Sequence, residues 1–586
     1  ATNPQWQHPT VWNPKVNYSF IKGRHSMKTG YEYQRIHTEI QDVNPLYGND
    51  LYAGQFSRPA GSAAPSAADS QAYNLADFLF GARSEYQLVN FYIAKYRQVM
   101  NYFYFQDDFK ITKKLTLNLG ARYEYATPQW EAGNVLSNFD PVTNKLIPAK
   151  SGSIADRAQI NPDRDNWAPR LGFAYSMNPK TVVRGGYGIS YIHFNRAGGG
   201  NLLGINGPQV VIAAIAQRPT DTSFRPTQAG YPTGLTDPDK FSPLLSNISY
   251  IPRDTPSGYV QNWSFSVQRE IMRNTVVDVG YVGNSSNHLV VFADYNEARP
   301  NRPGENASIQ ARRPNQAWSA ITVTFPAARA NYHALQARFE RKFTNGFSFL
   351  NSFVYSKAID TTGQALEAQG GSGGRSSPQS FYALSAERAA SDFDQRFNNT
   401  TAVIYELPFG KGRKYASSLP LAADYVLGGW QLNWIHSMWS GQPVNLSYNP
   451  AANFQVSQTL PDWRGGISYR PNVTGDIMVP KGQRNQDNWI DPTRVVIPTD
   501  PSQPFGNAGR NIARRPGLVQ ADIGIQKSFV LPFREGMAIQ FRAESFNAFN
   551  RTNFANPQMN RSNAGFGQIR TNFPARQVQF ALRLSF

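Results

Sequence analysis

The sequence predicts an all-β protein, an antiparallel up-and-down β-barrel that crosses a membrane with its strands. Three observations predict it: apolar and polar residues alternate with a period of two, the alternating segments are long, and the connections between them alternate between short and long. Successive side chains of a strand point to opposite faces, so a period of two indicates one apolar face and one polar face. Helical patterns of convincing length are nearly absent.

The segment 115–125 shows the alternation clearly. Its odd-numbered positions are Leu, Leu, Leu, Ala, Tyr and Tyr, and its even-numbered positions are Thr, Asn, Gly, Arg and Glu. The same pattern recurs and predicts about 17 strands, many of them longer than the ~9–11 residues with which a tilted strand crosses a bilayer. The predicted strands span 16–21, 25–38, 51–58, 85–98, 100–112, 115–127, 168–177, 181–192, 258–271, 275–285, 332–343, 347–359, 396–408, 429–441, 518–531, 537–550 and 575–586.

The connections favour a barrel of the outer membrane. In an up-and-down meander, alternate connections lie at opposite ends, so short turns at one end and long loops at the other match short periplasmic turns and long extracellular loops. Three connections depart from this order: 97–100 is short on the long-loop side, and 59–84 and 409–428 are long on the short-turn side. The short turns are 22–24, 113–114, 178–180, 272–274, 344–346 and 532–536, and the long loops are 128–167, 193–257, 286–331, 360–395, 442–517 and 551–574.

Composition excludes several other classes. The 586 residues contain no cysteine, which excludes a disulfide scaffold, a cysteine nucleophile and a thiolate metal site. Lys and Arg number 58 against 40 Asp and Glu, a formal net charge of +18, but these cations are scattered or lie in Gly/Pro-rich connections. We therefore expect solvated turns and no nucleic-acid partner. A soluble sandwich or propeller stays open as an alternative, although strand length and the aromatic residues at strand ends favour the barrel.

No motif predicts catalysis or a bound cofactor. The run Gly370–Gly374 matches G-x-S-x-G, but it lacks the preceding strand and following helix of a nucleophile elbow. The Gly198–Gly200 run lacks the Lys-Ser/Thr pair of a phosphate-binding loop. The seven histidines show no metal-binding spacing, and Asp163 and Asp165 lack the rest of a calcium loop, so we expect a solvated turn there. We expect no enzyme activity, no metal and no cofactor.

Two sets of residues are candidates for function. The last strand ends on an aromatic residue, which resembles the recognition signal of bacterial outer-membrane barrels, and Leu582, Leu584 and Phe586 are its predicted assembly signal. Polar faces of other strands would line a wet lumen, where charged residues either pair with one another or contact a plug or a solute. The lumen-lining candidates are Arg122, Glu124, Arg184, Glu270, Arg542 and Glu544.

Motifs along nearly the whole chain, from about Asn17 to Phe586, resemble one family. They are Phe105-Gln-Asp-Asp-Phe-Lys, Leu115-Thr-Leu-Asn-Leu-Gly-Ala-Arg-Tyr-Glu, Asn262-Trp-Ser-Phe-Ser-Val-Gln-Arg-Glu, Gly280-Tyr-Val-Gly-Asn, Asn331-Tyr-His-Ala-Leu-Gln-Ala-Arg, Asp392-Phe-Asp-Gln-Arg-Phe-Asn, Gly429-Trp-Gln-Leu and Phe541-Arg-Ala-Glu-Ser-Phe-Asn-Ala-Phe-Asn. Together they resemble the barrel of TonB-dependent receptors, in particular the Oar-like branch common in acidobacteria.

The resemblance implies a barrel of about 22 strands filled by an N-terminal plug, with energy delivered by a TonB-type complex through a short N-terminal box. It also implies a regulatory-like domain ahead of the plug. We therefore expect residues 1–586 to be the barrel domain of a longer product, with plug, regulatory-like domain and about five strands absent.

The expected function is uptake of a bulky nutrient, such as an oligosaccharide or a peptide, by a TonB-dependent transporter of the bacterial outer membrane. The expected partners are the lipid bilayer, the TonB-type complex, the plug, the outer-membrane assembly machinery and an unknown nutrient. Two alternatives stay open. One is a plug-free passive channel or a cell-surface scaffold that uses its long loops, and the other is a soluble secreted β-protein that binds glycans.

Overall fold

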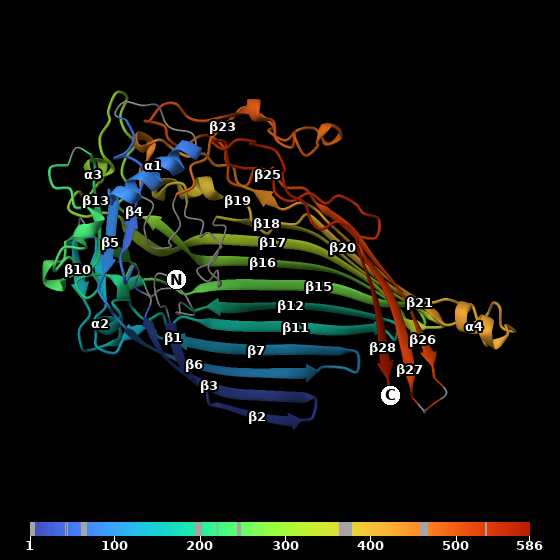
Figure 1. The fold of residues 1–586 in the computed structure, drawn as a ribbon. Helices are drawn as coiled ribbons and strands as arrows, with labels where there is room; N and C mark the ends of the chain where they lie inside the picture. Colours follow the sequence, from blue (N-terminus) through green and yellow to red (C-terminus); the bar gives the residue numbers. More distant parts are fainter. Residues whose placement is uncertain are drawn as a thin grey trace.

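A single 19-stranded sheet forms a curved wall that makes up most of the protein (Figure 1). The structure is a computed structural model, and it describes residues 6–586 except 42, 44, 60–66, 194–201, 220, 243–247, 362–377, 458–466, 532, 534 and 535. The strands run side by side and antiparallel. This architecture confirms the predicted fold class, a long antiparallel β-meander.

The wall follows chain order. Three short pieces, β8 (Trp130–Glu131), β14 (Ile248–Tyr250) and β19 (Ala389–Ala390), extend it locally, and β1 and β2 pair one after the other with β3. This leaves 15 long positions in the described part of the chain. They are β1 (Trp6–Trp12) with β2 (Lys15–Lys22), β3 (His25–Gln41), β6 (Ala94–Lys110), β7 (Leu115–Ala126), β11 (Trp167–Asn178), β12 (Thr181–Ile192), β15 (Gly258–Met272), β16 (Thr275–Asp294), β17 (Ile321–Thr344), β18 (Phe347–Asp360), β20 (Phe397–Glu406), β21 (Trp430–Trp439), β26 (Leu518–Val530), β27 (Ala538–Phe546) and β28 (Gln577–Ser585).

Two predicted strands are wrong. The segment 51–58 forms turns after β4 (Asn49–Leu51), and 85–98 and 100–112 are not separate wall strands. Instead β6 runs unbroken from Ala94 to Lys110 and pairs with β3 along its length, while β5 (Glu85–Val89) belongs to a small separate sheet. The prediction of two strands in this region failed because β6, like its partner β3, is longer than a bilayer requires. Residues 94–110 form one long strand, whereas the sequence analysis divided them between two strands of ordinary length.

This correction removes two of the three irregular connections. The residues 97–100 lie inside β6, and 59–84 is part of one long connection, 42–93, at the long-loop end. That connection contains α1 (Ala67–Phe80), a helix of 14 residues that the sequence analysis missed. Leu75, Phe78 and Leu79 of α1 are exposed, so no core-facing stripe marked it. The third irregular connection, 409–428, is real and contains α4 (Leu421–Leu427).

The long loops gather at one end of the wall and the tight turns at the other, as predicted (Figure 1). At the long-loop end, β14 pairs with β17, and the backbone N–H of Ala298 donates to the carbonyl of Val456 at 2.8 Å. At the other end, Asn345 and Gly346 form a tight turn with positive φ angles of 51° and 76°, which suits Asn-Gly hairpins. The loop layer also contains β9 (Ser137–Asp140) with β10 (Lys145–Pro148), β13 (Ile212–Ala216) with β5 and β4, β22 (Pro443–Val444) with β25 (Ala513–Arg514), β23 (Asn472–Val473) with β24 (Val495–Val496), α2 (Ile154–Ala158) and α3 (Ile309–Arg312).

The buried apolar residues lie mainly in this loop layer. One cluster joins Ile40 and Tyr96, at the loop ends of β3 and β6, to Leu136, Leu203 and Ile251. A second cluster surrounds Leu446 and Ile490 in the segment 442–517. A single-layer wall has no second sheet to pack against, so the loops supply the core.

Pairing register assigns the two faces of the wall, because directly opposite residues of neighbouring strands point to the same face. The register pairs Phe541 with Leu582, and further along the wall Leu117 with Phe173. Following it from strand to strand places all of these side chains on one face. That face carries large exposed apolar residues, among them Phe580 and Leu582 at 72% and 74%. Among the described residues, no helix is long and apolar enough to cross a membrane.

The two faces predict unequal tolerance to charge. Leu117 lies on the apolar face and Asn118 on the polar face, where its amide donates to Asp108 at 2.6 Å. Leu117→Arg is expected to lower assembly in membranes, since Arg on a barrel's lipid face costs from about 2–4 kcal/mol at the bilayer midplane down to about 0–1 kcal/mol near the interfaces. Asn118→Arg is the matched control, with little expected loss. The measurement is the fraction of protein that shows the heat-modifiable gel shift of a folded barrel, and equal fractions for the two variants would contradict the face assignment.

Candidate functional site

The six lumen-lining candidates all fall on the polar face of the wall, opposite Leu582. The register pairs Glu544 with Gln579, Arg184 with Ala174 and Glu270 with Val276, all on this face. Two of the arginines each form an ion pair with the glutamate two positions further along the same strand. Arg122 lies 3.0 Å from Glu124, and Arg542 lies 4.0 Å from Glu544. Arg184 donates to Gln268 at 3.0 Å. The lumenal role of these residues stays a prediction.

Arg122 and Glu124 belong to a larger charged cluster near the loop end of the wall. The Arg122 guanidinium also lies 3.8 Å from the Glu32 carboxylate and 4.5 Å from the centre of the Tyr102 ring. The second oxygen of Glu124 lies 2.8 Å from Nε2 of His193, which follows β12. Glu32 on β3, Arg122 and Glu124 on β7 and His193 directly after β12 thus form one chain of contacts along the polar face.

A chamber of about 590 Å³ lies where this cluster meets the loops. His193 is part of its lining, together with Asn284 and Tyr332 from the polar face of β16 and β17. Loop residues such as Ile251 and Phe393 add apolar surface. Asp163, considered above for calcium, also lines the chamber, and its carboxylate accepts from the backbone N–H of Ser257 at 2.7 Å. The chamber therefore combines aromatic and apolar surface with a few fixed polar groups.

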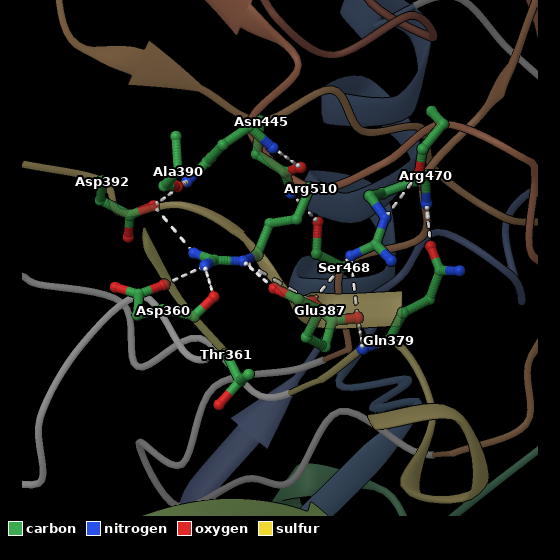
Figure 2. A network of polar contacts seen from close by, with 12 residues as sticks. Asp360, Thr361, Gln379, Glu387, Ala390, Asp392, Asn445, Ser468, Arg470 and Arg510 are labelled. Carbon is green, nitrogen blue, oxygen red and sulfur yellow. Dashed lines mark hydrogen bonds and ion pairs between the residues drawn. The ribbon is translucent and has the colours of Figure 1, made fainter. Parts of the chain in front are cut away.

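A buried network of ion pairs fixes the loops beside the chamber (Figure 2). Both carboxylate oxygens of Glu387 lie 2.9 Å from Nη1 of Arg470. Arg510 binds Asp360, the last residue of β18, and lies 3.4 Å from Asp392. Glu387, Arg470 and Arg510 are each no more than 5% exposed. Because Asp360 also lines the chamber, the network ties the segments 379–394 and 442–517 to its edge.

A family model described as an outer membrane beta barrel domain matches residues 1–579. The chain belongs to this outer-membrane β-barrel family. Its location is therefore the bacterial outer membrane, and its apolar face is the lipid-facing surface of the barrel. No curated protein gives a significant match.

Solved structures of outer-membrane receptors are similar to this barrel at low identity. The outer membrane transporter YddB from Escherichia coli is 9% identical, with a TM-score of 0.49 over 99% of this chain and 54% of that one. The siderophore receptor PirA from Acinetobacter baumannii is 11% identical, with a TM-score of 0.43 over 99% and 54%. The ferric enterobactin receptor PfeA from Pseudomonas aeruginosa is 11% identical, with a TM-score of 0.45 over 99% and 54%. The barrel spans about half the length of these structures, and its assignment rests on the family match alone.

Sequence reasoning missed the residues that organise the loops of the barrel. Glu387, Arg470 and Arg510 come from segments up to 123 positions apart, and no short-range spacing of residues in the sequence predicts their contacts. One signal was present: the family-like motif that begins at Asp392. Its first residue binds Arg510, and its second acidic residue, Asp394, accepts from the backbone N–H of Ala358 at 2.7 Å. The motif Gly370–Gly374 and the run Gly198–Gly200 lie outside the described residues.

Breaking the buried network is expected to loosen the loops of the barrel. Glu387→Gln would leave Arg470 and Arg510 without their shared carboxylate, and removing one partner of a buried pair costs about 3–5 kcal/mol. The matched control is Asp487→Asn, which removes the same charge from an exposed pair with Arg570, where the cost is about 0–1 kcal/mol. The measurement is hydrogen exchange of segment 467–515 in the folded barrel. Unchanged protection in Glu387→Gln would contradict the role of the network.

A second buried carboxylate links two loops outside the membrane span. Glu297 accepts hydrogen bonds from the Ser380 hydroxyl at 2.7 Å and from the backbone N–H of Phe381 at 2.6 Å. Burial raises the pKa of Glu297 to about 7, and the neighbouring carboxylate of Asp294 acts in the same direction. The two hydrogen bonds favour the ionised form but do not offset burial.

The contact at Glu297 is therefore expected to weaken as pH rises from about 4.5 to about 7. A carboxyl group whose folded pKa is raised binds more protons in the packed state than in the open state, so its contribution is complete below the ordinary pKa and is lost through this window. Glu297→Gln should flatten this dependence. The measurement is the opening free energy of the Phe381 amide, from hydrogen exchange corrected for intrinsic pH effects. Glu305→Gln is the control: Arg299 holds the pKa of Glu305 at about 2, so this variant should keep the slope.

Proposed function

We propose that the barrel is the wall of a transporter that takes up a bulky polar nutrient, such as an oligosaccharide or a peptide. The observation that carries this proposal is the chamber beneath the loops, which shares His193 with the charged cluster on the polar face. A solute entering from the loop side would meet the chamber first and the charged lumenal surface next. This sequence of surfaces suits capture followed by passage, without bond-making chemistry.

The lining of the chamber supports a sugar or peptide solute. Rings such as Tyr332 and Phe393 offer flat apolar surface against which sugar rings and aromatic side chains pack. Asn284, on the polar face of β16, offers both donors and an acceptor, which match hydroxyl and amide groups. Its volume of about 590 Å³ falls within the common range of small-molecule sites. The chamber would hold a few sugar units or residues of a longer solute.

The energy source and the missing parts of the transporter also belong to the proposal. The motif resemblance supports a plug and a TonB-type complex as partners. In the described residues, β2 pairs only with β3 and β28 only with β27, so each edge strand has one unpaired side. Unpaired backbone groups in lipid cost several kcal/mol each, which supports further strands that complete the wall. The assembly machinery would recognise Leu582 and Leu584, on the exposed apolar face of β28, and Phe586, the exposed residue directly after it.

Uptake by cells that carry the intact gene tests the proposal. The probes are fluorescein-labelled maltohexaose and a fluorescein-labelled hexapeptide. Tyr332→Ala removes a chamber ring and is expected to lower uptake several-fold, whereas Tyr355→Ala, on the lipid face of β18, is the matched control and should leave uptake unchanged. A protonophore should abolish uptake if an energised complex drives it.

Other outcomes separate the alternatives. Uptake that persists with the protonophore would favour a passive channel, and binding without uptake would favour a surface scaffold. Equal effects of the two tyrosine variants would contradict the assignment of the chamber as the solute site.

A further inference from the structure

The long connection at the short-turn end, residues 407–429, folds into a compact foot. It contains α4, whose Asp424 carboxylate accepts from the backbone N–H of Lys411 at 2.6 Å and so closes the segment on itself. The rings of Phe409 and Tyr415 lie 5.6 Å apart at the base of the loop. Figure 1 shows α4 at the end of the wall opposite the long loops. The uptake function proposed above does not involve this foot.

The foot packs on the lipid face of the wall. The register pairs Trp430 with Lys527 and Lys527 with Phe541, and Phe541 with Leu582, so all of these lie on the apolar face. The Tyr425 ring of α4 stacks over Phe529 on the same face at 6.5 Å and 3° between planes. The indole N–H of Trp430 donates to the carbonyl of Val426 at 2.8 Å. The helix is therefore held against the outside of the barrel, beside its lipid-facing surface.

Lys527 explains why the helix sits there. It is a cation on the lipid face, yet it is only 5% exposed, because α4 covers it. Its Nζ donates to the carbonyls of Asp424 and Tyr425 at 3.1 and 2.5 Å and lies 5.0 Å from the centre of the Phe529 ring. Carbonyls in the last turn of a helix carry partial negative charge and attract a cation. The foot thus satisfies a charge that bare lipid would not.

The outer surface of the foot is apolar. Leu421, Val426 and Leu427 are 65%, 66% and 56% exposed. Phe533, in the neighbouring tight turn after β26, is 80% exposed. Both connections begin with the same Leu-Pro-Phe sequence, at 407–409 and at 531–533. These exposed apolar side chains belong to the connections at the turn end of the wall.

Cations lie in the foot itself and in the other turns at this end of the wall. Lys411, Arg413 and Lys414 lie in the foot. Arg413 pairs with Glu406, the last residue of β20, at 2.9 Å, and Asp424, the one acidic residue of the foot, accepts from the Lys411 backbone. Lys22, Arg24, Lys113, Lys114, Lys180 and Arg273 lie in the other tight turns. Of the six short turns, only 532–536 contains an acidic residue, Glu535, which follows Arg534 in the sequence. Apolar side chains beside basic ones match a lipid surface, whose acyl boundary is apolar and whose anionic headgroups attract Lys and Arg.

We propose that the foot, residues 407–429, lies in the headgroup layer of the short-turn leaflet and binds anionic phospholipid there. Leu421, Val426 and Leu427 enter the acyl boundary, and Lys411, Arg413 and Lys414 contact headgroup phosphates. The foot then anchors the barrel at a fixed depth and orientation in the membrane, a role separate from uptake.

Site-directed spin labelling tests the proposal directly, since the chain has no cysteine of its own. Nitroxide labels are placed at Val426→Cys in the foot, at Val142→Cys in the loop layer, which is 87% exposed, and at Leu582→Cys on the wall. The barrel is reconstituted in phosphatidylcholine vesicles with or without phosphatidylglycerol. We expect the Val426 label to be several-fold less accessible to a water-soluble nickel complex than the Val142 label, with a further decrease when phosphatidylglycerol is present.

Charge-matched variants test the headgroup contact. Lys411→Gln, Arg413→Gln and Lys414→Gln together should abolish the response to phosphatidylglycerol. The control combines Lys145→Gln, Arg253→Gln and Lys481→Gln, three exposed cations of the loop layer, and should retain it. The heat-modifiable gel shift checks that each variant is folded.

Each other outcome overturns the proposal. A Val426 label as accessible as the Val142 label, while the Leu582 label is shielded, refutes the foot but leaves the barrel intact. A Leu582 label that is also accessible refutes membrane insertion itself, and the foot with it. A phosphatidylglycerol response that survives in the foot variant refutes the headgroup contact.

Discussion

Backbone hydrogen bonding in lipid is the constraint on which the rest of the structure depends. No water reaches the acyl layer, so every N–H and C=O of a spanning strand needs a partner on the next strand. The wall meets this demand with long regular ladders. The register shifts between its described strands lie toward the strand ends: near the turns at Ser176/Asn178, Glu270/Met272 and Arg341/Thr344, and near the loops at Ser286/Leu289 and Leu289/Val291. The middle of each strand is regular, and that regularity fixes which residues face lipid.

A single-layer wall also decides where a core can form. With lipid on one side and the lumen on the other, the strands have no layer to pack against, so the buried clusters around Leu136 and Leu446 lie in the loops. The ion pairs of Glu387 and Arg510 are buried there as well. Buried pairs contribute little net stability compared with apolar packing, but they exclude arrangements that would leave one charge unpaired. Their effect is to select one arrangement of the loops beside the chamber.

The two ends of the barrel differ in chemistry as well as in length. The loop end uses its charges internally, in buried pairs such as Arg470 with Glu387. The turn end has exposed cations such as Lys113 and Lys114, and in the described part of the chain α4 covers the lipid face at this end. Part of the net charge of +18 therefore comes from the tight turns, where many basic residues have no acidic neighbour in the same turn.

The sequence by itself determined the fold class, the two faces of the wall and most of its strands, because a period of two survives in any strand between lipid and water. It also selected six polar-face residues, from Arg122 to Glu544, by the same rule. Only the tertiary structure decided that Ala94–Lys110 is one strand, that His193 joins Glu124 and that Arg510 meets Asp360. These contacts join residues far apart along the chain, and loop geometry, which no short-range period encodes, brings them together.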